Sequence, residues 1–207
     1  GSIRTKVFIN ASAVGYYGHR RDETLTESDG PGEDFLARVC KKWEEEAYRV
    51  GDSFLKEATP PRVVTLRTGV VLGSEGGLKR MVTPFKFFIG GPLGKGDQWL
   101  PWIHIRDLTA IVRFITGNCE IIGPVNVTTP NPVRMKEFSK TLGEVLKRPS
   151  WLPVPEFVLK IALGRMSEML LHGQRAVPAK ISSYGFEFKY PELREALEEV
   201  LQRRRFC

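Results

Sequence analysis

The sequence predicts an α/β fold with a mainly parallel sheet, and three observations support this prediction. Short apolar or β-branched runs alternate along the chain with segments whose apolar residues recur every three or four positions. Turns rich in glycine and proline separate these segments. The 207 residues are 42% hydrophobic, which is enough for a packed core and excludes a disordered chain. Such alternation is typical of parallel sheets that are covered by helices.

The first strand and helix lie at the beginning of the chain. Residues 6–12 form an apolar run that ends in small polar residues, and a turn-rich stretch leads to a helix over residues 34–48. Asp34 is a suitable N-cap, because its carboxylate can accept a hydrogen bond from a backbone N–H of the first turn. Apolar residues at four-residue steps predict one buried stripe on this helix. The stripe consists of Phe35, Val39, Trp43 and Ala47.

Further strands and helices continue the alternation along the chain. The β-branched or extended runs are residues 62–68, 99–105 and 123–127. The segments with helical periodicity are residues 79–88, 107–116 and 135–146. Each run is followed by one of these helices, which favours strand–loop–helix units. We therefore expect residues 1–148 to form one α/β domain.

The pattern changes after Arg148. Residues 149–155 contain three prolines and form a stiff connector that we expect to be packed. The basic run 203–205 is either a solvated helix end or an anion-binding tail. The remaining segments with helical periodicity are residues 154–163, 167–171, 178–183 and 191–204. We therefore expect a small, mainly helical lobe over residues 149–207.

The charge balance indicates an anionic partner. Lysine and arginine outnumber aspartate and glutamate by 31 to 24, which gives a net charge of +7 and an isoelectric point near 9.4. Such a surplus favours phosphorylated small molecules, nucleic acid or anionic surfaces. No aromatic–basic string or known nucleic-acid-binding module accompanies the charge. We therefore expect an anionic small molecule and no nucleic acid.

Cysteine usage and hydropathy predict an intracellular protein of a reducing compartment. The three cysteines are far apart and form no CxxC pair, so they indicate neither a disulfide framework nor a zinc site. No run of about 18 apolar residues occurs, and the first residues lack the apolar stretch of a signal peptide. We expect no membrane partner, and both plastid and cytoplasm are compatible with the sequence. The cysteines are Cys40, Cys119 and Cys207.

Several known motifs are absent. The run 90–96 is rich in glycine, but its spacing and the glycine that follows Lys95 do not match a P-loop. Neither G-x-G-x-x-G nor G-x-S-x-G occurs, so a dinucleotide fingerprint and a hydrolase nucleophile are both missing. The three histidines are isolated, which predicts no metal site, and His104 is either structural or a ligand contact. The glutamates 44–46 favour a solvated helix face over a catalytic pair.

The string from Ser12 to Gly18 follows the first expected strand. Ligands bind at the carboxyl ends of the strands in open α/β sheets. The hydroxyl of Ser12 and the phenols of Tyr16 and Tyr17 could polarise a carbonyl or transfer a proton there. A packed aromatic corner beneath a loop is the alternative interpretation of the same string.

These strings resemble the extended short-chain dehydrogenases/reductases, and within them the epimerase family proteins related to nucleoside-diphosphate-sugar epimerases. The string from Ser12 to Gly18 is similar to the strand end that carries the catalytic serine of that superfamily, with one residue inserted. Residues 66–73 resemble the strand and loop that border the nicotinamide, and residues 102–108 resemble a strand-to-helix segment near the substrate. The resemblance implies the C-terminal part of a Rossmann-like doubly wound parallel sheet.

The resemblance also implies site residues and a cofactor, NAD or NADP. The implied catalytic residues are Ser12, Tyr16 and Tyr17. The implied cofactor contacts are Ala11, Arg67, Thr68, Gly69 and Val70. The implied substrate contacts are Lys95, Trp102, His104 and Arg106. Each of the cations in these sets has a second interpretation as an ordinary surface or salt-bridged residue.

One departure from the superfamily concerns its Tyr-x-x-x-Lys pair. When Glu44 is aligned with the glutamate that follows this pair, Leu36 takes the place of the tyrosine and Cys40 takes the place of the lysine. Leu36 has no proton to transfer, and a thiol with a pKa near 8.5 is not a fixed cation. Cys40 is therefore either a buried helix residue or a functional thiol, and the standard mechanism is in doubt.

A second departure is the missing dinucleotide-binding half, which in the family precedes the segment seen here. A sheet without that half exposes an open edge, which the missing half or a partner protein should cover. The resemblance also implies a homodimer. It predicts the substrate-side portion of an NAD(P)-dependent, sugar-nucleotide-epimerase-like oxidoreductase that transfers hydride at a secondary alcohol or ketone. The alternative is a non-catalytic interaction or regulatory module of the same fold, located in a plastid.

Overall fold

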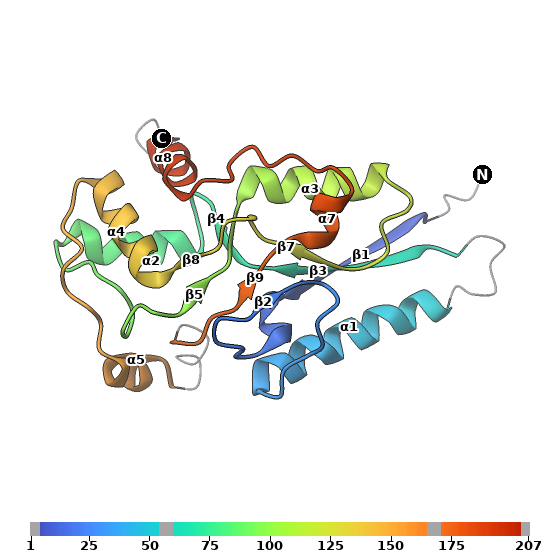
Figure 1. The fold of residues 1–207 in the computed structure, drawn as a ribbon, viewed down its shortest axis with the longest axis horizontal. Coiled ribbons are helices and arrows are strands. Elements are labelled where there is room, and N and C mark those ends of the chain that lie inside the picture. Colours follow the sequence, from blue (N-terminus) through green and yellow to red (C-terminus); the bar gives the residue numbers. More distant parts are fainter. Residues whose placement is uncertain (1–4, 54–59, 165–170, 204–207) are drawn as a thin grey trace.

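A computed structural model describes residues 5–53, 60–164 and 171–203 and confirms the α/β prediction. A parallel three-stranded sheet lies at its centre (Figure 1). The sheet order is β1-β3-β7, so β1 forms one edge with β3 as its neighbour. The strands are β1 (Val7–Ala13), β3 (Arg62–Thr68) and β7 (Gly123–Val127).

Helices cover both faces of this sheet. The helix α1 (Phe35–Ser53) packs on β1 and β3, whereas α3 (Ile105–Gly117) and α7 (Ala179–Ser183) lie on the opposite side (Figure 1). Side chains from α3, α7 and the strands form one apolar cluster, and burying each of them contributes about 1.5–3 kcal/mol. Its fully buried members include Val64, Ile111, Ile115, Val125 and Ile181.

The prediction for the buried stripe of α1 was wrong at two of its four positions. Phe35 and Trp43 have exposed fractions of 56% and 54%, and only Ala47 of the predicted stripe is buried. The residues of α1 that face the sheet are small or polar. They are Ala37, Cys40, Glu44 and Ala47. The N-cap prediction was correct, because the Asp34 carboxylate accepts a hydrogen bond from the Ala37 N–H at 2.8 Å.

A second apolar core lies between three helices outside the central sheet. These helices are α2 (Gly77–Lys86), α4 (Met135–Leu146) and α8 (Leu193–Arg203). Their buried side chains include Leu78, Phe85, Phe138, Leu142 and Leu197. A further helix of this region, α5 (Glu156–Leu163), follows the proline-rich connector.

Short strand pairs join distant parts of the chain. The strand β2 (Thr24–Leu25) pairs with β9 (Arg175–Ala176), and β4 (Val70–Leu72) pairs with β6 (Trp102–His104). The strand β5 (Trp99–Leu100) pairs with β8 (Val133–Arg134). The run predicted as extended over residues 99–105 is therefore divided, because Pro101 lacks an N–H for a ladder hydrogen bond.

The segment beyond Arg148 packs against the α/β part at several places. The connector is anchored through its backbone, since the N–H groups of Trp151 and Leu152 both donate to the Gly90 carbonyl, but most of its side chains are exposed and not packed as predicted. The helix α8 contacts α4, and α7 contacts β7. The predicted helix 167–171 falls almost entirely on residues outside the described ranges, as do Arg204, Arg205 and Cys207. Among the described residues, no helix is long and apolar enough to cross a membrane.

Candidate functional site

Three polar side chains lie side by side at the carboxyl ends of the parallel strands. Ser12 of β1 is in register with Arg67 of β3, and Arg67 is in register with Asn126 of β7. All three side chains are buried. Parallel pairing brings these residues together, since they come from strands that are more than 50 residues apart in the chain. This edge of the sheet is where open α/β folds bind their ligands.

Glu44 of α1 holds two members of this row. The Ser12 hydroxyl donates to Glu44 Oε1 at 2.8 Å, and the guanidinium of Arg67 donates to both carboxylate oxygens, each at 2.9 Å. A bidentate, buried arginine–carboxylate pair fixes both side chains in orientation as well as in charge. The sequence interpretation of residues 44–46 as a solvated face was therefore wrong for Glu44 and correct for Glu45 and Glu46, which are exposed.

The two tyrosines after β1, in the 3₁₀ helix η1 (Val14–Tyr17), have different surroundings. Tyr17 is fully buried, donates its phenol proton to Asn126 Oδ1 at 2.7 Å and accepts a hydrogen bond from Arg67 at 3.0 Å. Burial raises the pKa of Tyr17 to about 12, although Arg67 and Asn126 act in the opposite direction. Tyr16 is half-buried, and its ring lies over the Arg67 guanidinium at 3.5 Å. Tyr16 is therefore the phenol that a ligand can reach.

Arg67 is a fixed cation at the centre of the network. Burial by itself would lower its pKa, but the hydrogen bonds to Glu44 and Tyr17 raise the pKa of the guanidinium above its ordinary value. Its charge is thus present throughout the accessible pH range. The rings of Tyr16 and Tyr17 both lie within cation–π distance of it.

The positions aligned with the superfamily's Tyr-x-x-x-Lys pair are apolar in character here. Leu36 packs against Gly15, where an added Cβ would lie only 2.4 Å from the Leu36 side chain. Cys40 is fully buried, and burial raises the pKa of its thiol. A buried thiol with a raised pKa is a poor nucleophile and carries no charge. Of the two interpretations of Cys40, the surroundings favour the buried helix residue.

A second carboxylate, Glu27, connects this network to the C-terminal lobe. The backbone N–H groups of Asn126 and Lys180 donate to its two oxygens at 3.0 and 3.1 Å. The Asn126 side chain also donates to the Val177 carbonyl at 2.9 Å. The roles of Glu27, Glu44 and Asn126 were not predicted from the sequence. Asn126 could have been found, because it lies near the end of a predicted strand, as Ser12 does.

The residues expected to contact a cofactor lie at the carboxyl ends of β1 and β3. Ala11 is exposed, and Thr68, Gly69 and Val70 are half-buried, whereas Arg67 belongs to the buried network. The N–H groups of Gly69 and Val70 donate to the carbonyls of Val127 and Pro101, so both are already used within the fold. Gly69 and Val70 therefore offer no free backbone donor to a ligand.

The residues expected to contact a substrate are not joined to this network by any hydrogen bond in the described part of the chain. Lys95 is exposed, and Trp102 and His104 are fully buried. His104 caps α3 by accepting from the Arg106 N–H at 3.1 Å, and its Nε2 lies 3.0 Å from Glu199. Burial lowers the pKa of His104. These contacts favour the structural interpretation of His104.

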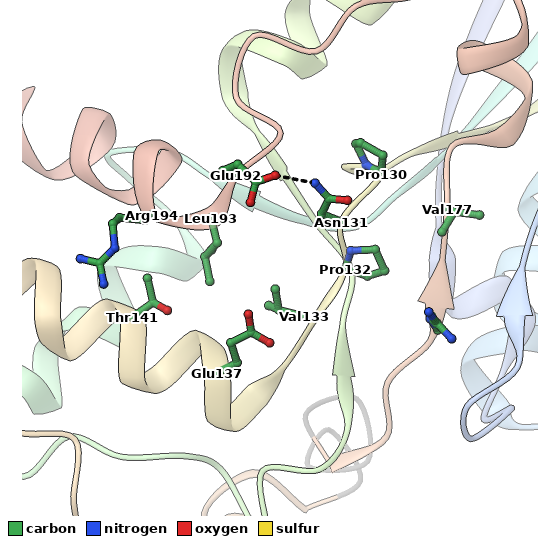
Figure 2. A pocket seen from close by; sticks show the side chains of 11 residues that line it. Pro130, Asn131, Pro132, Val133, Glu137, Thr141, Val177, Glu192, Leu193 and Arg194 are labelled. Carbon is green, nitrogen blue, oxygen red and sulfur yellow. Dashed lines mark hydrogen bonds between the residues drawn. The ribbon is translucent and has the colours of Figure 1, made fainter.

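A cavity of about 390 Å³ lies between the segment after β7, α4, α8 and β9 (Figure 2). Asn131 donates to Glu192 across its rim at 2.8 Å, and Glu137 also lines it (Figure 2). Arg175 lines it as well, and its buried Nε has no hydrogen-bond partner among the described residues. The Arg175 guanidinium lies 4.8 Å from the Trp99 ring. Arg175 was not among the contacts predicted from the sequence.

The described residues contain no group of three or more His, Cys, Asp or Glu side chains that could hold a metal ion. A pair of imidazoles, His19 and His172, lies with ring centroids 4.7 Å apart. Burial and the neighbouring His172 lower the pKa of His19.

Comparison with known proteins connects this geometry to a family. Over 203 residues the chain is 45% identical to the epimerase family protein YfhF of Bacillus subtilis (strain 168), with 98% of this chain and 65% of that protein aligned. The chain belongs to the epimerase family proteins. It is also 44% identical over 200 residues to the Arabidopsis thaliana protein described as "Epimerase family protein SDR39U1 homolog, chloroplastic" (96% of this chain, 56% of that protein). The chain thus spans less than two thirds of the length of either relative.

Solved structures agree with this assignment. The crystal structure of human epimerase family protein SDR39U1 (isoform2) with NADPH has a TM-score of 0.86 and 32% identity, covering 95% of this chain and 65% of that chain. The nucleoside-diphosphate sugar epimerase of Corynebacterium glutamicum has a TM-score of 0.73 and 33% identity, covering 97% of this chain and 38% of that chain. Residues 154–200 match the family model described as "Domain of unknown function (DUF1731)". These neighbours confirm the prediction of a Rossmann-like fold.

Proposed function

We propose that the chain is the substrate-side portion of an NAD(P)-dependent, epimerase-like oxidoreductase that acts on a secondary alcohol or ketone. The observation that carries the proposal is the buried row of Ser12, Arg67 and Asn126 at the ligand-binding edge of a parallel sheet. The human relative was crystallised with NADPH, and both this cofactor and the epimerase names of the relatives support the proposal.

Ser12 and Tyr16 are the proposed contacts to the reacting oxygen of the substrate. Since Ser12 donates its proton to Glu44, its lone pairs remain free to accept a hydrogen bond from a substrate hydroxyl. Tyr16 supplies a phenol whose ring is held against the Arg67 cation. We assign Tyr17 to positioning, because it is fully buried and its hydroxyl is bonded to Asn126 and Arg67.

The residues present fit the reactive end of a nicotinamide dinucleotide and not its pyrophosphate. Gly69 has no room for a side chain, because an added Cβ would lie 2.6 Å from the Pro101 carbonyl oxygen, so the packing of the fold itself requires a glycine at the end of β3. Ala11, Thr68 and Val70 supply small or apolar surface beside it. When bound, the nicotinamide would supply the hydride donor or acceptor. The glycine-rich cradle for the pyrophosphate is absent from these 207 residues.

An anionic substrate group is the proposed ligand of the cavity beside β9. Arg175 has a buried donor without a partner among the described residues, and a phosphate oxygen would satisfy it. Glu137 and Glu192 line the same cavity, so an anion is expected near Arg175 and hydroxyl groups near the carboxylates. A phosphorylated sugar carries both kinds of group.

The test is NADPH binding by the native protein that carries this sequence, measured by cofactor fluorescence. We expect saturable binding, and we expect Ser12→Ala with Tyr16→Phe to abolish turnover of a nucleotide-sugar panel while leaving cofactor affinity within about threefold. Glu45→Ala, on the exposed face of α1, is the matched control. NADPH fluorescence that does not change on titration would refute the proposal.

The alternative function, a non-catalytic interaction or regulatory module, is favoured by Leu36 and Cys40 at the positions of the catalytic pair. The chloroplastic description of the Arabidopsis relative makes a plastid the compartment to examine first. The alternative predicts that a cell lacking the native protein is rescued equally by the Ser12→Ala, Tyr16→Phe variant and by the unchanged protein. Rescue by the unchanged protein alone would exclude it.

A further inference from the structure

Eight large apolar side chains of the helical lobe and of the loop after α2 are exposed, and we call them the lobe patch. They belong to the loop after α2, to the proline-rich connector and to α5. Trp151 connects the first two segments, because its indole N–H donates to the Phe88 carbonyl at 3.0 Å. Trp151, Phe157 and Ile161 have exposed fractions of 64%, 64% and 82%. The full set is Phe87, Phe88, Ile89, Trp151, Leu152, Phe157, Val158 and Ile161.

Cations border this surface. The sequence of the lobe patch, residues 86–89 and 147–161, contains four basic residues and one acidic residue, Glu156. Lys86, Lys147 and Arg148 are exposed, and none of them forms a salt bridge within the described ranges. Lys86 and Lys147 also line a cavity to which Glu144 and Glu198 contribute. The Arg148 guanidinium lies 4.4 Å from the centre of the Phe88 ring. The surface thus combines aromatic and aliphatic side chains with positive charge.

The combination identifies the class of partner. Soluble proteins rarely expose contiguous apolar areas beyond a few hundred Å² unless these areas bind something. Helices that bind to the surface of an anionic bilayer have an exposed apolar side, with tryptophan at its margin and lysine or arginine around it. We propose that the lobe patch attaches the protein peripherally to a membrane surface that contains anionic lipid.

A second copy of the chain is a poorer fit to the lobe patch. In a two-fold symmetric contact the same surface meets itself, so the cations of one copy would lie near those of the other. Like charges brought together at an interface oppose association. Anionic headgroups would instead neutralise Lys86, Lys147 and Arg148 while the acyl region receives the apolar side chains.

Peripheral attachment differs from the sequence expectation of no membrane partner. That expectation rested on the lack of a spanning segment, and surface attachment needs none. The residues of the lobe patch are separate from the network of Ser12, Glu44 and Arg67, so attachment and ligand binding can be tested independently.

Co-sedimentation of the native protein that carries this sequence with lipid vesicles tests the proposal. The probes are vesicles of phosphatidylcholine alone and of phosphatidylcholine with about one third phosphatidylserine. We expect binding to the anionic vesicles only, and a decrease of at least about tenfold in the variant with Trp151→Ser, Phe157→Ser and Ile161→Ser. The matched control, Phe35→Ser with Trp43→Ser, removes equally exposed side chains from α1 and should bind within about twofold of the parent chain.

A charge variant keeps the apolar surface intact and covers the case in which the triple variant folds poorly. Lys86→Gln with Arg148→Gln should weaken binding by about fivefold for each cation removed. Sedimentation equilibrium without lipid reports the second-copy alternative. A parent chain that does not sediment with anionic vesicles would overturn the proposal, as would a triple variant that binds them fully or one whose only effect is to convert a dimer into monomers.

Discussion

The carboxyl end of the sheet and the lobe patch depart from ordinary protein architecture in opposite ways. At the sheet the interior is polar, with Ser12, Glu44 and Arg67 buried together. On the lobe the exterior is apolar, with Trp151 and Ile161 largely exposed. The buried polar groups satisfy one another and are therefore rigidly positioned. The exposed apolar groups gain little from the fold itself, so one region is suited to orienting a ligand and the other to attachment.

The largest predicted effect is the loss of the Glu44 carboxylate. Glu44→Ala leaves Arg67 buried without its counter-ion, so we expect the free energy of unfolding to fall by about 3–5 kcal/mol, measured by urea denaturation. Glu46→Ala removes only an exposed pair with Arg49 and should cost less than about 1 kcal/mol. Equal losses in the two variants would show that the buried pair has no special role in stability.

A smaller loss is expected from the buried phenol. Tyr17→Phe removes the hydrogen bonds to Asn126 and Arg67 and leaves both partners buried, which should lower the free energy of unfolding by about 1–3 kcal/mol. Tyr16→Phe keeps the ring over Arg67 and should change it by less than about 0.5 kcal/mol. If Tyr16→Phe proves the more damaging to stability, the assignment of the two phenols must be reversed.

The pH dependence of stability tests the surroundings of His104. Burial lowers the pKa of His104 in the folded chain. Below about pH 6.5 the unfolded chain therefore binds a proton at this histidine more readily than the native chain does. Stability should therefore fall as the pH decreases from this value through the lowered pKa of His104. His104→Asn replaces the capping Nδ1 with an amide oxygen that can also accept from the first turn of α3, and it should weaken this dependence, as measured by urea denaturation between about pH 8 and pH 5. An unchanged slope in the variant would assign the titration to other groups.

A small effect is predicted for the exposed tryptophans. Trp151→Ser and Trp43→Ser remove large side chains from the surface, and each should change the free energy of unfolding by less than about 1 kcal/mol. Thermal unfolding of the two variants against the parent chain provides the measurement. A cost above about 2 kcal/mol for Trp151→Ser would mean that this side chain stabilises the lobe, which weakens the case for an attachment surface.

The architecture was predicted well from the sequence because the pattern of strand and helix is local. Alternating segments and the N-cap at Asp34 depend on nearby residues, and the structure contains both. The same reasoning predicted that Ser12 would lie at the ligand-binding edge of the sheet, because the position of a residue at a strand end is readable from the sequence.

The parts of the site that were not predicted depend on distant residues. Hydrophobicity selected Phe35 and Trp43 for the buried side of α1, yet that side carries Glu44. A buried carboxylate is tolerated only because Arg67 is delivered to it by β3, and the pairing of β1 with β3 is not a local property. The small residues Ala37, Cys40 and Ala47 were the available signal, since at helical spacing they mark a side that approaches a sheet closely.

The bidentate pair between Glu44 and Arg67 also constrains which substitutions such a protein can accept during evolution. Loss of either partner alone leaves a buried charge, whereas replacing both with well-packed apolar residues can preserve stability. A protein that loses one partner before the other therefore passes through an intermediate sequence of lower stability. Among proteins that share this arrangement, residues at the two positions should be exchanged as a pair, and a lineage that has exchanged them should have altered the hydroxyl at Ser12 as well.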